Sequence, residues 1–294
     1  MPVMHSHYRE SGKAVVDQER CTACCLCADT CPAEVLELVD GRVRQTDYGF
    51  GCIACGHCMM VCPEACIEVS GRDLSLADLV PLPPAEERAT AGALQKTMEA
   101  RRSVRRFADR ELAPELIKRI IDMAATAPMG VPPWDVGVTT ISGFAEVRSV
   151  AAEVVNGYRG MLKVMRPGLL KLIGPLLGQV RKERFSNFIL PLAKMYINAH
   201  EQGRDVVFWG APAVLVFHHS PYTDAADAMI ACTYAMLAAE TMGLGSCMIG
   251  GAPPILQRNR DLCRTLGIPG GNKPAIALTL GYPAVPFKRA IRRR

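Results

Sequence analysis

The chain lacks the features that mark a membrane-spanning or a secreted protein. Its 294 residues contain no uncharged apolar run of the length, about eighteen residues, that a membrane-spanning helix needs. The opening segment, residues 1–12, is polar and has no apolar stretch typical of a secretory signal. The net charge of +5 is modest, and no basic stripe interleaved with aromatic residues accompanies it. We therefore expect no membrane span and no nucleic-acid partner.

Cysteine, in contrast, is abundant and gathers in one window. Ten of the thirteen cysteines lie between Cys21 and Cys66. Eight of these form two copies of the run C-x2-C-x2-C-x3-C-P, and they are Cys21, Cys24, Cys27 and Cys31, then Cys52, Cys55, Cys58 and Cys62. Two such runs in tandem are the spacing of a bacterial-type ferredoxin with two [4Fe–4S] clusters.

The spacing also predicts which cysteines share a cluster. Three thiolates two residues apart can wrap around one cubane, and the fourth ligand then comes from the other run. This assigns Cys21, Cys24, Cys27 and Cys62 to one cluster, and Cys52, Cys55, Cys58 and Cys31 to the other. Two further cysteines of the window, Cys25 and Cys66, fall outside the repeat, and we expect them to be small buried residues rather than ligands.

Disulfide bonds and zinc sites are the alternatives to clusters in a cysteine-rich segment. A disulfide framework suits a small secreted domain. A pair of zinc sites requires C-x2-C pairs that are separated by a longer gap. Neither alternative predicts three evenly spaced cysteines followed by Cys-Pro, twice. Because free thiols on this scale require a reducing compartment, we expect a cytoplasmic protein.

The composition changes after the cysteine window, which indicates two domains. Residues 1–72 form the expected ferredoxin-like domain, 73–92 a linker that includes the stiff stretch Pro81–Pro84, and 93–294 a second domain. Within the first domain, residues 35–44 predict a β-hairpin, because Asp40-Gly41 suits a tight type I′ turn. The segment after Cys62 mirrors the segment after Cys31.

The second domain alternates between helical and extended patterns. Helices are expected at 94–98, 114–124, 224–242 and 255–266, and strands at 136–141, 213–219 and 275–281. The glycines of residues 243–251 follow a helix rather than a strand, which excludes a Rossmann fingerprint. Residues 155–200 are apolar and basic, and we expect a helical lid or a dimer element there rather than a membrane contact.

Several side chains of this domain are candidates for binding or catalysis. The segment 101–107 holds four arginines and a serine within six residues, a set that can surround a phosphate or form a solvated basic helix end. No residue stands out as a general acid or base. Candidates for proton delivery are Tyr158, Tyr196, His218 and His219, although a histidine pair at a strand end is more often structural.

Four segments, taken in order, resemble the FMN-dependent nitroreductase family: 101–107, 127–134, 243–250 and 280–283. With the cysteine repeat, the whole chain is similar to the ferredoxin-fused nitroreductase-like proteins of anaerobes. The resemblance implies an α+β fold, an intertwined homodimer and FMN at the subunit interface. The family usually has an Asn and a Gln in the loop after Ala127-Pro128, and residues 129–134 have neither, so we expect a more apolar substrate pocket.

The resemblance also implies the cofactor-binding residues. Arg101, Arg102, Ser103 and Arg105 correspond to phosphate and ribityl ligands of FMN. Gly250 and Gly251 fall where backbone amides approach the flavin N5 edge. Lys288 and Arg289 match the C-terminal positive charges that bind phosphate in the family.

The expected function follows from joining the two domains. Electrons from an external reduced ferredoxin or flavodoxin cross two [4Fe–4S] clusters to FMN, which reduces a small organic acceptor such as a nitro compound, a quinone or an activated C=C bond. The alternative is an electron carrier or redox sensor without a dedicated organic substrate. An open, apolar cavity beside the flavin favours the enzyme, and a plugged one favours the carrier.

Overall fold

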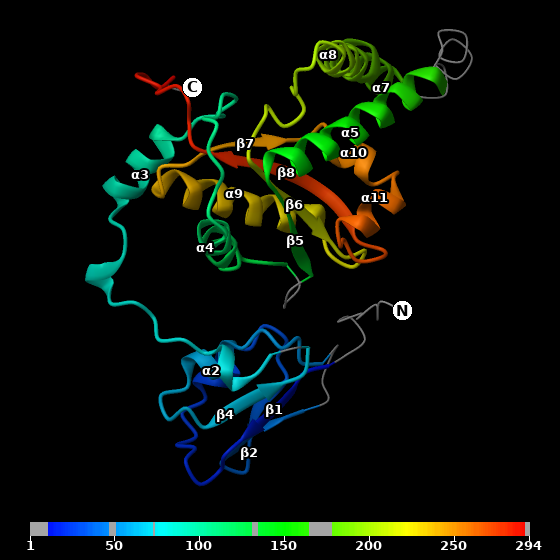
Figure 1. Ribbon diagram of the computed structural model, residues 1–294. Helices are drawn as coiled ribbons and strands as arrows, with labels where there is room; N and C mark the ends of the chain where they lie inside the picture. The colour runs from blue at the N-terminus through cyan, green and yellow to red at the C-terminus, as the bar shows by residue number, and fades with distance from the viewer. Residues whose placement is uncertain (1–10, 47–50, 73, 131–134, 165–177, 292–294) are drawn as a thin grey trace. The chain divides into compact units, whose positions relative to one another are not determined.

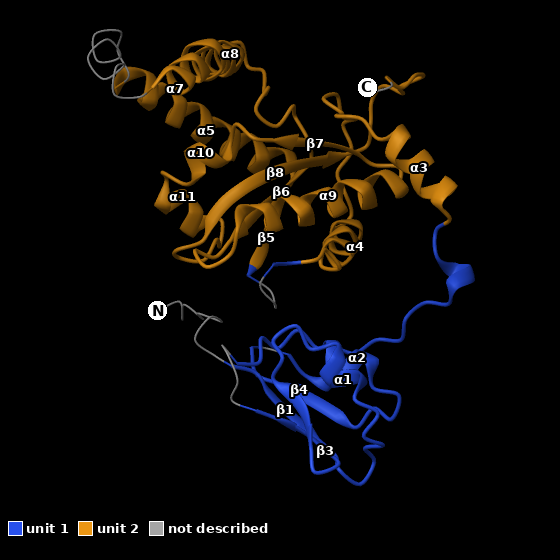
Figure 2. Cartoon of the chain, turned by 180° about the vertical axis from the view of Figure 1, so that it is seen from behind, with its two compact units in different colours: residues 1–89, 129–135 blue, residues 90–128, 136–294 orange. Residues whose placement is uncertain are grey.

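The computed structural model describes residues 11–46, 51–72, 74–130, 135–164 and 178–291 (Figure 1). The chain divides into two compact units (Figure 2). The first comprises residues 1–89 with 129–135, and the second comprises residues 90–128 with 136–294. The division near residue 90 falls inside the segment 73–92 that the sequence predicts as a linker, and two short 3-10 helices, η2 (Leu76–Asp78) and η3 (Ala85–Glu87), lie in it.

The first unit is built from two similar halves. Its elements are β1 (Lys13–Val16), α1 (Leu26–Asp29), β2 (Leu36–Val39), β3 (Arg42–Gln45), α2 (His57–Val61) and β4 (Ile67–Ser70). Strand β1 pairs antiparallel with β4, and β2 with β3. The turn between β2 and β3 has positive φ at Asp40 (49°) and Gly41 (74°), which confirms the predicted type I′ hairpin.

The cysteine repeat is also a repeat of backbone structure. Helices α1 and α2 start 31 residues apart, as Cys21 and Cys52 do, and so do strands β2 and β4. Left-handed backbone recurs with the same offset, at Ala23 (54°) and Ala54 (52°) and again at Glu34 (53°) and Ala65 (44°). A non-glycine residue adopts this conformation at a cost, so its recurrence marks a loop shape that both halves need.

The second unit is a four-stranded antiparallel sheet between two layers of helices. The strand order is β5 (Val136–Ser142), β6 (Ala213–His219), β8 (Lys273–Gly281) and β7 (Gly245–Ile249). Helices α4 (Pro114–Ala124) and α9 (Ala225–Thr241) cover one face, and α5 (Phe144–Val164) and α8 (Leu190–Glu201) cover the other (Figure 1). Alternate residues of β6 enter different cores, Val214 and Val216 one and Leu215 and Phe217 the other, which explains its continuous apolar run.

Most of the predicted elements of this unit are present. Helix α4 has the predicted bounds, and α9 begins after Asp224, whose side chain accepts a hydrogen bond from the N–H of Ala226. The helix predicted around Leu94 is α3 (Ala91–Ala100).

The single helix predicted over residues 255–266 is wrong. The chain forms two short helices instead, α10 (Pro253–Leu256) and α11 (Arg260–Thr265). Asn259 separates them, because its side-chain oxygen accepts a hydrogen bond from the N–H of Leu262 at 3.0 Å and so caps α11.

The basic segment 155–200 is helical in its described part. The described elements that follow α5 are α7 (Gln179–Arg184), a π-helical turn η4 (Phe185–Ile189) and α8. Helix α8 packs against α5 through buried residues that include Val154, Tyr158, Ala193 and Tyr196. Residues 165–177, which contain Arg166 and Lys171, lie outside the described residues. Within the described part of the chain, no helix is long and apolar enough to cross a membrane.

Candidate functional site

Two small cavities in the first unit gather the eight cysteines of the repeat. One is lined by Cys21, Cys24, Cys27 and Cys62, and the other by Cys31, Cys52, Cys55 and Cys58. Each cavity therefore holds three cysteines of one run and the last cysteine of the other. The structure brings together the two sets of four that the crossed assignment predicts.

The cysteines fit a multinuclear cluster better than disulfide bonds or zinc sites. All thirteen cysteines lie among the described residues as free thiols, so no disulfide framework exists. Among those described residues, no group of three or more candidate ligands is close enough to hold a single metal ion. Four thiols spread around one cavity suit a larger inorganic body.

Burial disfavours the ionised form of three of these thiols, Cys27, Cys52 and Cys58. The pKa of Cys62 is lowered instead, because its desolvation is outweighed by hydrogen bonds from Cys66. Desolvation, followed by the charge of neighbouring Cys52, raises the pKa of Cys58 to about 12. Desolvation also raises the pKa of Cys27 and Cys52. Since the thiolate is the metal ligand, cluster binding at these sites has to displace protons.

The second unit contains one large cavity, of about 1400 Å³, on the α5–α8 side of the sheet. Its lining is mostly apolar and comes from α5, η4, α8 and the end of β7, with Phe185, Phe188, Leu192, Met195 and Trp209 among the side chains. Ligand pockets commonly measure about 300–1,000 Å³, so this cavity has room for a cofactor together with a second molecule.

Three of the residues predicted to bind cofactor line this cavity: Arg105, Gly250 and Gly251. The Arg105 guanidinium lies over the Trp209 ring, 5.7 Å from its centroid. Neither backbone N–H of the two glycines has an acceptor among the residues that the structure describes. A Cβ added at Gly250 would meet nothing within 4 Å. Here a cation and two available amide donors lie on the walls of one apolar cavity, as a phosphorylated flavin would require.

The other residues predicted to bind FMN do not line the large cavity. Arg102, Lys288 and Arg289 line a second cavity of about 380 Å³, together with Glu240. Arg101 and Ser103 line neither. The cause is the extended backbone of this segment, which is fixed where the N–H of Val104 donates to the carbonyl of Ser246 at 2.9 Å. Successive side chains of an extended segment point to opposite sides. Arg102 and Arg105 are three residues apart, so they face different cavities.

Tyr158 and Tyr196 lie directly against Gly251. The Tyr158 hydroxyl donates a hydrogen bond of 2.7 Å to the carbonyl oxygen of Gly251. The two phenol rings meet edge to face, with centroids 5.5 Å apart. Burial raises the pKa of both tyrosines, so both remain protonated donors at neutral pH. The sequence offered them as proton-delivery candidates but gave no signal of their contact with Gly251.

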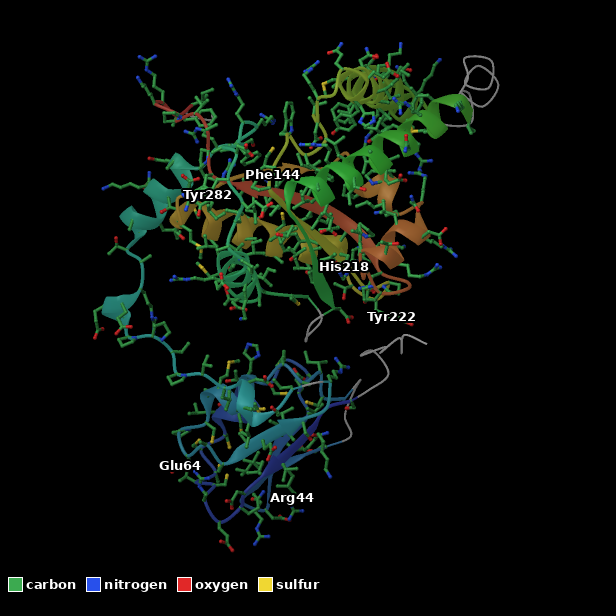
Figure 3. The ribbon with its side chains drawn as sticks, in the orientation of Figure 1. Arg44, Glu64, Phe144, His218, Tyr222 and Tyr282 are labelled. Atoms are coloured by element: carbon green, nitrogen blue, oxygen red, sulfur yellow. The ribbon has the colours of Figure 1, made fainter. Side chains whose placement is uncertain are left out.

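His218 and His219 do not line the large cavity. Both are buried at the end of β6, where Figure 3 labels His218. His218 lies within hydrogen-bond distance of Thr139, at 3.4 Å, and Asn272, at 3.0 Å. Burial, followed by the charge of His219, lowers the pKa of His218 to about 4. These contacts give the pair a structural role in the sheet, away from the cavity.

Trp209 is a cavity residue that sequence reasoning did not identify. It sits in a tight turn with φ of 60°, before Gly210. The Asp205 carboxylate holds this turn, because it accepts hydrogen bonds from the N–H groups of Val207, Phe208 and Gly210. The available sequence signal for this turn was Asp205 followed, four residues later, by Trp209-Gly210.

The sequence also predicted a more apolar loop at residues 129–134. Most of that loop, residues 131–134, lies outside the described residues.

Comparison with known proteins supports both halves of this description. Residues 98–282 match the family model described as the nitroreductase family, and residues 14–37 match the 4Fe-4S binding domain model. No curated protein matches the chain.

Two solved structures share the fold of the second unit. A nitroreductase with bound FMN from Bacteroides fragilis is 18% identical, with 68% of this chain and 94% of that chain covered and a TM-score of 0.52. A nitroreductase with bound FMN from Desulfitobacterium hafniense is 20% identical, with the same coverage and a TM-score of 0.51. The α+β fold class is thereby confirmed. The chain belongs to the nitroreductase family and carries a 4Fe-4S binding domain before its nitroreductase domain.

Proposed function

We propose that the protein is an FMN-dependent oxidoreductase in which two [4Fe–4S] clusters supply electrons to FMN for the reduction of a small organic acceptor. One observation carries the proposal: the large cavity brings Arg105 together with the available amides of Gly250 and Gly251, in a family whose solved relatives hold FMN. The two cavities with four cysteines each support the cluster half of the proposal.

The residues of the chain have distinct tasks in this account. Arg105 offers a permanent positive charge to the FMN phosphate. The N–H groups of Gly250 and Gly251 orient the flavin ring from the end of β7. When bound, the clusters transfer single electrons, and FMN accepts one or two electrons and delivers a hydride. The protonated Tyr158 holds the carbonyl group of Gly251 with a hydrogen bond, and the Tyr196 ring packs beside the same glycine.

The size of the large cavity favours an enzyme over a carrier or sensor. A carrier needs room only for its cofactor, whereas this cavity exceeds the usual size of a site for one small ligand. Its apolar walls suit an aromatic nitro compound, a quinone or an activated C=C bond. Arg184, Arg258 and Arg260 also line it, and they would favour an acceptor with an acidic group.

The proposed partners follow from the surface and from the redox chemistry. Large apolar side chains at and near the cavity are exposed, namely Val164, Val180, Phe188 and Met195. A second copy of the chain that covers them would form a homodimer. The electron donor would be an external reduced ferredoxin or flavodoxin. Thirteen cysteines without a disulfide bond suit a reducing compartment such as the cytoplasm.

Anaerobic purification with quantification of iron, sulfide and flavin tests the proposal. We expect about eight iron atoms and one FMN per chain. The dithionite-reduced protein is then mixed with a panel of acceptors in a stopped-flow instrument. Fast flavin reoxidation by one class of acceptor establishes the enzyme and its substrate type. Iron without flavin, or a flavin that no organic acceptor reoxidises quickly, favours the carrier or sensor.

A further inference from the structure

The internal repeat shows how the two cysteine sites differ. With the offset of 31 residues, Cys25 corresponds to Gly56, and Cys66 corresponds to Val35. Cys25 and Cys66 both line the first site, with Cys21, Cys24, Cys27 and Cys62. Gly56 and Val35 line the second site. Two extra thiols therefore surround one site only, at positions where the other has none.

Of the two extra thiols, Cys66 contacts a proposed ligand directly. Its Sγ lies 3.5 Å from the Sγ of Cys62, and its backbone N–H donates to the same sulfur at 3.4 Å. The residue is buried, with 7% of its surface exposed, immediately before β4. Cys25 makes a different contact, because its thiol donates to the carbonyl oxygen of Ala23 at 3.4 Å.

Ligation of Cys62 decides the direction of this hydrogen bond. A cluster-bound cysteine is a thiolate and has no proton to give, so the S–H group of Cys66 is the donor. We propose that Cys66 is a positioning residue that raises the reduction potential of the first cluster by donating an S–H···S hydrogen bond to Cys62. The inference rests on the proposed cluster sites.

The sign of the effect follows from charge. Reduction adds one negative charge to the cluster and its thiolates, so a hydrogen-bond donor stabilises the reduced form more than the oxidised form. A higher potential results. The second site has a valine at the corresponding position, so its cluster receives no such donor from this position.

The test is a potentiometric titration of the anaerobically purified holoprotein, followed by EPR, with iron content measured in parallel. Cys66→Ala removes the donor, whereas Cys66→Ser keeps an O–H donor. Cys25→Ala is the matched control, since it removes the other extra thiol of the same site. Val35→Cys introduces a thiol at the corresponding position of the second site, which Cys31 also lines.

We expect all four variants to keep about eight iron atoms per chain. Cys66→Ala should lower the potential of one cluster and leave the other unchanged. Cys66→Ser should restore most of that shift, and Cys25→Ala should shift neither potential. Val35→Cys should raise the potential of the other cluster.

Two results overturn the inference. One is an unchanged pair of potentials in Cys66→Ala. The other is the loss of about four iron atoms in that variant, which would make Cys66 a ligand instead of a donor. A wild-type protein without [4Fe–4S] clusters contradicts the proposed function itself, so the two failures are distinguishable.

Discussion

The Tyr158 hydroxyl donates a hydrogen bond to the carbonyl oxygen of Gly251 and so ties helix α5 to the end of strand β7. The contact spans 93 positions of the chain. It holds the carbonyl group of Gly251, and both Gly250 and Gly251 line the large cavity. We therefore expect the position of a cofactor in that cavity to depend on a buried tyrosine that need not touch the cofactor.

Removal of that hydroxyl should weaken both the fold and cofactor binding. Tyr158→Phe leaves the Gly251 carbonyl without its donor, which should lower the free energy of unfolding by about 1 kcal/mol. We also expect a several-fold increase in the FMN dissociation constant. Urea unfolding of the flavin-free protein and fluorescence titration with FMN measure the two effects. Tyr234→Phe, at an exposed tyrosine of α9, is the control and should change neither.

The two glycines should respond differently to an added methyl group. A Cβ at Gly251 would lie 2.6 Å from the Tyr196 hydroxyl oxygen, and that ring is buried. Gly251→Ala should therefore cost about 1–3 kcal/mol of stability. Tyr196→Phe in the same chain should recover part of that loss, because it removes the clashing atom. Gly250→Ala, whose Cβ meets no atom, should leave the midpoint of urea unfolding close to wild type.

Paired cysteine substitutions test the crossed assignment of the clusters. Cys21 and Cys62 line the same cavity, so the double alanine variant should lose one cluster and keep about four iron atoms. Cys21 and Cys31 line different cavities, so their double variant should lose both clusters. Iron and sulfide analysis after anaerobic purification distinguishes the two. The reverse pattern would show that each run holds its own cluster.

His218 should make the stability of the second unit depend on pH. Its pKa falls from 6.5 to about 4 on folding, because burial penalises the charged ring. Between pH 6.5 and pH 4, His218 binds a proton more readily in the unfolded chain than in the folded chain. The contribution of His218 to the free energy of unfolding is therefore full above pH 6.5 and decreases as the pH falls toward 4. The full loss would be about 3 kcal/mol.

Urea unfolding between pH 5 and pH 7.5 follows this dependence. We expect His218→Gln to be less stable at pH 7.5 but to show a flatter pH profile, since it has no proton to bind. An equally steep profile in the variant would assign the dependence to another group.

Local patterns allowed much of the fold to be predicted. Helix α4 and strand β6 have the predicted bounds, because a proline at the first helical turn and a continuous apolar run are signals carried by neighbouring residues. The split at Asn259 was missed, since a capping side chain within an apolar pattern is a weak signal. The cysteine spacing, in contrast, carried enough chemistry to indicate which thiols share a cavity.

The flavin site was harder to predict because it depends on distant contacts. The motif 101–107 indicated a set of arginines, but its extended backbone sends Arg102 and Arg105 to different cavities. That conformation is fixed by pairing with Ser246, which is far away in the sequence. The tyrosine pair reaches the same cavity through the packing of α5 and α8 on the sheet, and Trp209 reaches it from the turn that Asp205 holds. No local pattern encodes such an arrangement.

The most direct test of the account is whether the clusters feed the flavin. Cys24 lines the first cluster site and is exposed, so Cys24→Ala should disrupt that cluster with little effect on the second unit. The account predicts that this variant loses turnover driven by reduced ferredoxin, while FMN stays bound and reducible by dithionite. Cys25→Ala, in the same loop, should retain turnover. Unchanged ferredoxin-driven turnover in Cys24→Ala would contradict the proposed route of electrons.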